Sequence, residues 1–315
     1  MEHVQIYERP SLREPTLIVA FGGWNDAAEV ATTAARQVVR QLEGRRFAAI
    51  DAEEFYVFTE TRPHVKIVGA NQRQIDWPAN EFFAVENPTG ERDFVVLAGV
   101  EPQLRWKTFT TAILGICEEV GVRSSVGRGG LLADVPHTLP PKLTGSATDP
   151  ELHRRLRGLR VGGSRYEGPT GILGVLSAAA RERGLETASI WGNVPHYISS
   201  TFNPRVALSI LRQLAQLLDL PLSFGDLERQ ADTFDAEVSE VVSHNPEVAE
   251  YVRQLEQRQG RRRRRSSESA QPGELPSGEQ LIQDVEAFLK QQPPTASELD
   301  EAIDEDEEDE EEEDK

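Results

Sequence analysis

The sequence predicts an α/β fold in which a mostly parallel sheet carries helices on both faces. Short apolar runs alternate with helical patterns over residues 1–220, as they do in repeated βαβ units. The unit is clearest near the start of the chain. There the apolar run 17–21 passes through Gly22 and Gly23 into a helical pattern over 26–43. About five or six strands with helices on both faces form the simplest assembly.

The remaining elements follow the same two periodicities. The expected strands are 17–21, 47–51, 65–68, 94–99, 121–126 and 188–191. The expected helices are 26–43, 105–120, 171–183 and 204–218. The turn residues 87–90 separate the apolar runs 82–85 and 94–97, so this pair fits a hairpin as well as two separate strands.

Helix starts are marked in the sequence itself. Asp26 and Glu29 have the spacing of a capping box, and small residues recur at helical spacing after them. Asn203 and Pro204 are typical of a cap and a first helical position, and Pro221 ends that helix. We therefore place the boundary of the α/β core at residue 220.

Residues 221–259 form a predicted helical extension of two short helices, broken near Asn245 and Pro246. Its apolar positions can pack on the core or on another subunit, and core packing is the commoner outcome for such a stripe. These positions are Leu227, Phe234, Val238, Val241, Val248, Val252 and Leu255.

Residues 260–315 are predicted to be a disordered linker and acidic tail. Residues 298–315 hold fourteen acidic residues and one lysine, which is −13 of the net charge of −19 and leaves −6 for residues 1–297. Such a run repels itself and buries no apolar surface. Residues 261–265 are five arginines, and no aromatic residues interleave them as stacking platforms, so nucleic acid is not an expected partner. Residues 278–292 fit a short amphipathic helix.

Several functional classes lack their signatures. The chain has no G-x-x-x-x-G-K-[ST] and no G-x-S-x-G motif. The six histidines are scattered, and the single cysteine, Cys117, fits a core position, so neither a metal nor a cofactor is expected. No apolar run reaches the ~18–20 residues of a membrane span and no secretory signal is visible, so we predict a cytoplasmic protein.

Four polar loops remain as candidate sites, each near a predicted strand end. In a parallel sheet such loops converge at the carboxyl edge, where α/β folds bind ligands. His137, Glu167 and His196 are the candidate acid/base groups. The candidate ligand-binding residues are Gly22, Gly23, Trp24, Asn25, Asp26, His137, Thr138, Tyr166, Glu167, Thr170, His196 and Tyr197. The alternative is that these are ordinary turn and capping residues.

The same segments carry a family resemblance. LIVAFGGWNDAAEVATTA, EEFYVFTETRP, LLADVPHT, YEGPTGILGVL and VPHYISSTFNPRVALSIL, in this order, resemble the bacterial branch of the proteasome assembly chaperone 2 family. The resemblance spans roughly residues 5–258. It implies a three-layer αβα sandwich of phosphorylase/hydrolase-like type, a small helical C-terminal addition and self-association. The family's segment around Phe55 and Tyr56 commonly holds an acid where this chain has Val57.

Two functions fit these observations. The first is a non-catalytic assembly or scaffold protein that self-associates as a homo-oligomer and binds a protein partner. The resemblance allows a proteasome-related partner, but the chain ends Glu313-Asp314-Lys315 and lacks the hydrophobic-Tyr-x docking tail of some archaeal relatives. The alternative is a small-ligand-binding protein or enzyme of phosphorylase/hydrolase type that uses the cleft at the sheet edge. A catalytic role is the less expected of the two.

Overall fold

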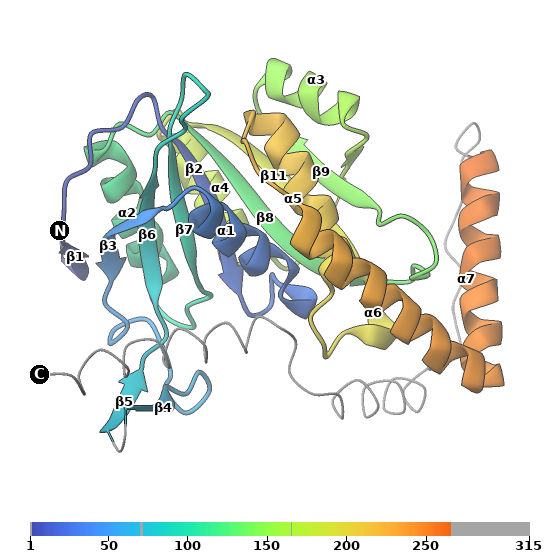
Figure 1. The fold of residues 1–315 in the computed structure, drawn as a ribbon. Helices are drawn as coiled ribbons and strands as arrows, with labels where there is room; N and C mark the ends of the chain where they lie inside the picture. Colours follow the sequence, from blue (N-terminus) through green and yellow to red (C-terminus); the bar gives the residue numbers. More distant parts are fainter. Residues whose placement is uncertain (1, 70–71, 165, 266–315) are drawn as a thin grey trace, which may run out of the picture.

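A nine-stranded sheet forms the centre of the molecule (Figure 1). The computed structural model describes residues 2–69, 72–164 and 166–265. The strands lie in the order β1-β3-β6-β7-β2-β8-β11-β9-β10. Their bounds are β1 Val4–Ile6, β2 Thr16–Gly22, β3 Arg45–Ile50, β6 Asn80–Val85, β7 Phe94–Val100, β8 Ser124–Ala133, β9 Leu143–Ala147, β10 Gly162–Gly163 and β11 Glu186–Pro195.

The sheet is parallel at its centre, and its flanks combine antiparallel pairs with one parallel pair, β9–β10. β2 pairs in parallel with both β7 and β8, and β8 pairs in parallel with β11 along its whole length. The antiparallel pairs are β1–β3, β3–β6, β6–β7 and β9–β11. The β6–β7 pairing confirms the hairpin alternative for the two apolar runs around residues 87–90. The predicted mostly parallel sheet is therefore confirmed, with its parallel strands in the middle.

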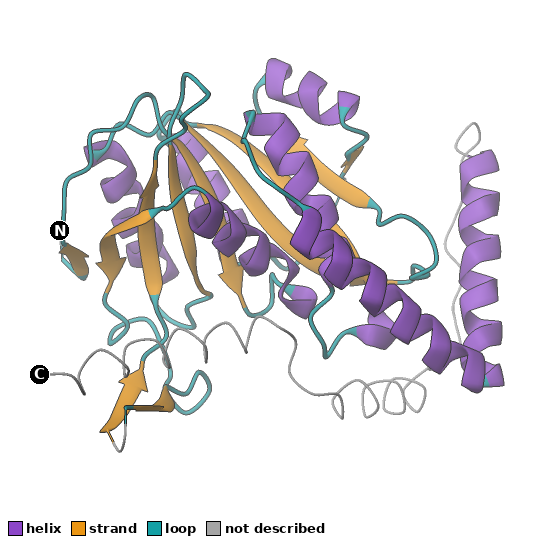
Figure 2. Ribbon diagram, viewed as in Figure 1, coloured by secondary structure: helices purple, strands orange, loops and turns teal. Residues whose placement is uncertain are grey.

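Helices cover both faces, as Figure 2 shows by colour, and the expected three-layer αβα sandwich is confirmed. On one face α1 (Val30–Gln41), α3 (Pro150–Gly158) and α5 (Pro204–Leu218) enclose a core that includes Ile18, Ala20 and Ile190. On the other, α2 (Trp106–Glu119) and α4 (Ile172–Glu182) pack on Leu17, Val19 and Leu97. β2 is buried on both faces because its side chains alternate between the two cores.

The start of the first helix differs from the prediction. A 3₁₀ turn, Ala27–Glu29, precedes α1, and Ala28 and Glu29 have φ of 53° and 54°. Asp26 therefore does not form the predicted capping box with Glu29. Its carboxylate instead accepts hydrogen bonds from the backbone N of Ala31 at 2.6 Å and of Thr32 at 3.1 Å, one turn further on. Because of this extra turn, the first unpaired backbone amides of α1 lie further along the chain than the spacing of Asp26 and Glu29 predicts.

Several strands also differ from the prediction in their bounds or in the sheet to which they belong. β8 begins at Ser124 and extends to Ala133, because Gly121 (φ 77°) ends the preceding helical segment rather than starting a strand. β11 continues to Pro195, so residues 193–195 are strand, and the 3₁₀ turn His196–Ile198 follows. The predicted strand 65–68 is not in the central sheet. It lies in β4 (His64–Val68), which pairs only with β5 (Gln72–Asp76) in a separate hairpin.

The helical extension consists of α6 (Gly225–His244) and α7 (Pro246–Arg265). The break falls at the predicted position, where Asn245 Oδ1 accepts from the backbone N of Glu247 at 3.1 Å and of Val248 at 3.2 Å. Both helices are longer than expected, and α7 includes the five arginines that we placed in a linker. The predicted acidic tail and the short helix over 278–292 lie outside the described residues.

Candidate functional site

The predicted loops emerge from one edge of the sheet. β2, β7, β8 and β11 run in the same direction, so their carboxyl ends at Gly22, Val100, Ala133 and Pro195 share this edge. We call it the carboxyl edge; it lies at the lower side of the sheet in Figure 1. The segment from β3 to β6, which contains the β4–β5 hairpin, leaves from the same edge because Ile50 pairs with Asn80 there.

Asn25 lies in a first polar cluster, together with a residue that the sequence analysis missed. Oε1 of Glu101 accepts hydrogen bonds from Nδ2 of Asn25 at 2.6 Å and from the backbone N of Ile172 at 2.7 Å. Glu101 directly follows β7, and Ile172 is the first residue of α4. The carboxylate therefore satisfies an orphan amide at a helix start. A Cβ at Gly171 would lie 2.4 Å from Oδ1 of Asn25, so any larger residue here would displace the hydrogen-bonded side chain of Asn25.

Asp26 is almost fully buried beside this cluster and serves the fold. Besides the two backbone amides of α1, its carboxylate accepts from Oγ1 of Thr32. Burial raises the pKa of Asp26, while the hydrogen bonds from Thr32 and Ala31 oppose that rise. These partners all belong to the first turns of α1, so Asp26 has the capping role that the sequence pattern left open as the alternative.

The other loop candidates near this cluster face solvent. Trp24, Glu167 and Thr170 are exposed, and so is Tyr166, whose hydroxyl donates to the carbonyl O of Pro169 in its own loop at 2.9 Å. Gly22 and Gly23 link β2 to the loop, and Gly23 has φ 110°. The side chains of Trp24, Tyr166, Glu167 and Thr170 share an edge with Asn25 and are exposed to solvent there.

A second cluster forms at the ends of β8 and β11. The hydroxyl of Tyr197 accepts from the backbone N of His137 at 2.8 Å and lies 2.8 Å from Nδ1 of the same residue. Burial lowers the pKa of His137 to about 4, against a smaller opposite effect of Glu256. His137 is therefore neutral near pH 7, and its hydrogen-bond partners are the chain's own groups.

The helical extension covers this second cluster. Nε2 of His196 lies 3.3 Å from the Tyr251 hydroxyl of α7, and its Nδ1 lies 3.4 Å from Oδ1 of Asp134. Thr138 donates to Oε1 of Glu256 at 2.5 Å. Around Tyr197 and Ile198 the apolar residues of the extension form a small core: Phe234, Val238, Val242, Val248, Val252 and Leu255. The stripe after Pro221 thus packs within the chain, as expected.

Little space is left beside His137. A hollow lined by residues that include His137, Arg205 and Asp235 has a volume of about 20 Å³, enough for a water molecule. Within the described part of the chain, no three His, Cys, Asp or Glu side chains gather to hold a metal ion. None of the described helices is long and apolar enough to cross a bilayer.

Comparison with known proteins is consistent with this architecture. A model of the PAC2 family matches residues 20–242. The chain belongs to the PAC2 family. Two bacterial relatives of known structure support the assignment. A PAC2 family protein from Streptomyces avermitilis is 38% identical, with a TM-score of 0.68 over 76% of this chain and 99% of that one. A proteasome-assembly chaperone homologue from Mycobacterium tuberculosis is 34% identical, with a TM-score of 0.68 over 75% and 99%.

More distant solved structures share only the fold. An archaeal proteasome activator from Pyrococcus furiosus is 20% identical, with a TM-score of 0.62 over 76% of this chain and 97% of that one. No curated protein matches the chain. The family segment around Phe55 and Tyr56 is buried here. The Tyr56 hydroxyl donates to the carbonyl O of Val100 at 2.6 Å, so this segment is attached to the carboxyl end of β7.

Two further polar features of this PAC2 fold escaped the sequence analysis. Arg128 on β8 is completely buried, and none of its three guanidinium nitrogens has a hydrogen-bond partner within the described ranges. Burial lowers its pKa to about 9, and the charge of Asp26 opposes this shift. Arg128 could have been singled out from the sequence, because it follows an apolar run that forms a buried strand, and an unpaired charge is rarely buried.

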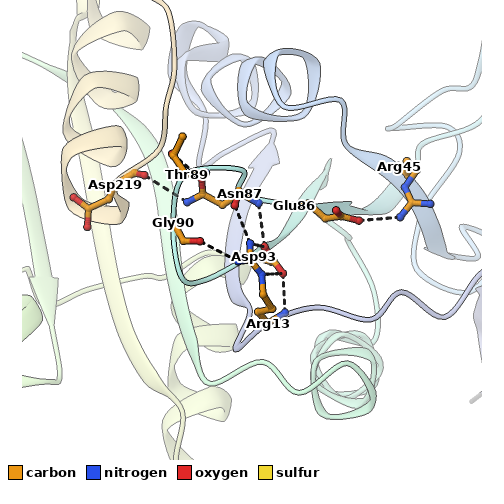
Figure 3. Close-up of polar contacts among 8 residues, drawn as sticks. All are labelled: Arg13, Arg45, Glu86, Asn87, Thr89, Gly90, Asp93 and Asp219. Carbon is orange, nitrogen blue, oxygen red and sulfur yellow. Dashed lines mark hydrogen bonds and ion pairs between the residues drawn. The ribbon is translucent and has the colours of Figure 1, made fainter.

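The other feature lies at the opposite, amino edge (Figure 3). Asp93, just before β7, accepts from Nη2 of Arg13 at 2.6 Å, from the backbone N of Arg13 at 2.7 Å and from the backbone N of Asn87 at 3.0 Å. Burial alone raises the pKa of Asp93, but these hydrogen bonds outweigh it and hold the pKa below its usual value. The cluster ties the 86–93 turn to the N-terminal segment.

Proposed function

We propose that this protein is a non-catalytic assembly or scaffold protein that self-associates and binds a protein partner at the carboxyl edge of its sheet. Family membership supports the class, and the relative from Mycobacterium tuberculosis is named as a proteasome-assembly chaperone homologue. A proteasome-related partner is therefore the first to test.

The main support for this proposal is the position of the exposed apolar side chains. All the large, exposed apolar residues of the described ranges except Tyr7 lie at the carboxyl edge or on the hairpin that leaves from it, with 38% to 67% of each accessible. They are Trp24, Val65, Ile67, Val68, Ile75, Trp77, Leu104, Leu131, Leu132 and Tyr166. Apolar surface concentrated on one side of a molecule is typical of protein-binding surfaces.

The polar candidate residues support the same proposal, because their hydrogen-bonding groups are already engaged by other groups of this chain. His137, His196 and Tyr197 are covered by the chain's own helices, Asn25 is bonded to Glu101, and Asp26 is bonded to the start of α1. A site for acid/base catalysis needs such groups free to reach a substrate. Binding through exposed apolar side chains needs no such group.

The test compares two full-length variants, Trp24→Asp at the edge and Tyr7→Asp away from it. Each tagged variant is expressed in the organism that the protein comes from, and it is purified under native conditions. We expect a stoichiometric protein partner with the wild type and the Tyr7 variant, and its loss with Trp24→Asp. Recovery of no such partner by the wild type, or equal recovery by both variants, would contradict the proposal.

The alternative, a small-ligand-binding protein or enzyme, would use the hollow beside His137, Arg205 and Asp235, which would have to widen because its present volume fits only a water molecule. A thermal-shift screen against nucleosides, nucleotides and carboxylates tests it. A ligand present at 100 times its dissociation constant adds ~2.7 kcal/mol of stability. A shift that disappears in His137→Ala or Glu167→Ala would support the alternative, and no shift across the screen would exclude it.

A further inference from the structure

Three chain segments at the carboxyl edge expose large apolar side chains and lie next to one another. The backbone N of Gly130 in β8 donates to the carbonyl O of Asn25 at 2.8 Å, and Gly171 lies directly against the side chain of Asn25. The exposed apolar residues of these segments have between 38% and 67% of their surface accessible. We call them the loop patch: Trp24, Leu131, Leu132 and Tyr166.

The charge around the loop patch is negative. The segments 23–29, 131–134 and 166–171 hold four acidic residues and no lysine or arginine. Three of these acids are exposed: Glu29, Asp134 and Glu167. The bases of this edge lie further along the sheet, because the β4–β5 hairpin leaves beyond β7 and Lys142 precedes β9 beyond β11. Arg105, which precedes α2, is paired with Glu54 at 2.5 Å.

The two helix starts beside the loop patch are occupied by carboxylates of this chain. The backbone N of Ile172, the first residue of α4, is bonded to Glu101, and two backbone amides of α1 are bonded to Asp26. Oδ1 of Asn25 is buried and has no donor among the described residues. This edge therefore has acceptors in excess, and a partner that supplies donors and positive charge fits it better than an anion.

The exposed rings of the loop patch also lack a cation. Among the described residues, the rings with an arginine above them are those of Tyr7 and Phe224, and Arg46 lies 4.9 Å from the ring centroid of Tyr7. No arginine or lysine of the described ranges covers Trp24 or Tyr166 in this way. An indole ring attracts a cation to its face, and an arginine can stack on that ring while it donates to a neighbouring carboxylate.

We propose that the loop patch binds a segment of the protein partner in which an arginine or lysine stands next to apolar residues. The inference rests on the proposed function and names the chemistry of that partner. The apolar side chains of the segment cover Leu131 and Leu132, and its cationic group lies over the ring of Trp24 beside the acids Glu29 and Glu167. Apolar contact and complementary charge then act at the same place.

Selection of random peptides displayed on phage, with the immobilised full-length protein as target, tests this chemistry. The library is first depleted on the double variant Trp24→Ala/Glu167→Gln. This variant keeps the acidic residues 298–315, so depletion also removes the peptides that bind them. We expect the peptides that remain and bind the wild type to be enriched in arginine and lysine next to leucine, isoleucine or valine.

The matched control is the double variant Tyr7→Ala/Glu91→Gln, which alters an exposed aromatic residue and an exposed acid outside the loop patch. Depletion on this control should abolish the enrichment, because the control still binds the peptides of the loop patch. Circular dichroism and melting temperatures that match the wild type show that both double variants fold.

A selected peptide with a fluorescent label then gives the size of each effect. We expect Trp24→Ala to weaken its binding about tenfold, because the cation loses its aromatic ring. Glu167→Gln should weaken binding about threefold, since it removes one exposed charge. Replacement of the peptide's arginine by neutral citrulline should weaken binding at least about threefold, and added salt should weaken the binding of the arginine form. Tyr7→Ala and Glu91→Gln should leave the affinity unchanged.

Two results would overturn the inference and leave the proposed function standing. One is a set of peptides that depend on Trp24 but hold no excess of arginine or lysine, and the other is equal binding of the arginine and citrulline peptides. Failure to recover any peptide that distinguishes the wild type from Trp24→Ala/Glu167→Gln would also overturn it. The proposed function is decided separately, by recovery of the protein partner with Trp24→Asp.

Discussion

The Tyr197 hydroxyl lies 2.8 Å from Nδ1 of His137 and 2.8 Å from the backbone N of the same residue. Because the hydroxyl accepts the backbone hydrogen, its own hydrogen is available to Nδ1, which favours the neutral imidazole with its proton on Nε2. The residue that sequence pattern suggested as an acid/base group is thus fixed between a tyrosine of η2 (His196–Ile198) and the helical extension.

This arrangement predicts a stability that depends on pH. The pKa of His137 falls from 6.5 to about 4 on folding because the side chain is buried. The unfolded chain therefore binds the proton more readily, so stability is fully present above pH 6.5 and is lost as the pH falls from 6.5 towards 4. The contribution has a slope of at most ~1.4 kcal/mol per pH unit.

Urea unfolding of wild type and His137→Asn at pH 7, 6 and 5 measures this slope. The variant should lose less stability than the wild type over that interval. His153→Asn, on the exposed side of α3, is the matched control and should follow the wild type. Parallel slopes for wild type and His137→Asn would show that His137 titrates normally in the folded protein.

Glu101 should matter for stability although it was not a predicted site residue. Glu101→Ala leaves the Asn25 amide and the Ile172 backbone N without their acceptor, at a cost of about 1–3 kcal/mol. Chemical denaturation measures the loss, and hydrogen exchange should locate it at the start of α4. Glu167→Ala, an exposed acid in the preceding loop, is the control. Equal stability of the two variants would contradict the capping role.

Asp93 should stabilise the amino edge in a pH-dependent way. Asp93→Ala removes the acceptor of two backbone amides and of Arg13, at a cost of about 1–3 kcal/mol near pH 7. Because folding lowers the pKa of Asp93, its contribution is present above the unfolded value of about 4 and is lost as the pH falls through the folded value. The stability difference from wild type, measured at pH 7 and in acid, should therefore shrink in acid. Glu91→Ala is the control, and a difference that grows in acid would refute the prediction.

Arg128 should be dispensable for folding. Among the residues that the structure describes, its guanidinium has no hydrogen-bond partner, and the charge of Asp26 opposes the effect of its burial. Arg128→Met replaces this group with an apolar side chain of similar length, so the unfolding free energy should stay constant or rise by about 1–4 kcal/mol. Asp26→Asn should act in the opposite direction, because it removes a helix cap and the opposing charge together. A clear loss of stability in Arg128→Met, measured by thermal unfolding, would show that other groups stabilise the guanidinium.

The fold class, the main helices and the break at Asn245 followed from the sequence, because each depends on local chemistry. The apolar residues of α5 recur at helical spacing, Asn203 caps its first turn with a 3.0 Å bond to the backbone N of Val206, and Pro246 cannot continue α6. Likewise the convergence of the loops at one edge follows from parallel strand direction, which the alternation of strands and helices already indicates.

The sequence by itself determined the parallel strands at the centre of the sheet, the four main helices of the core and the edge that carries the polar loops. Only the tertiary structure decided that α6 and α7 fold back over His137 and His196, that Glu101 joins Asn25 to α4, and that β4 and β5 pair outside the central sheet. Each of these three features depends on contacts between residues far apart in the chain, and such contacts cannot be predicted from a local sequence pattern. A buried Tyr197 and an exposed Trp24 occupy similar polar loops, and only the packing around each makes one a core residue and leaves the other exposed to solvent.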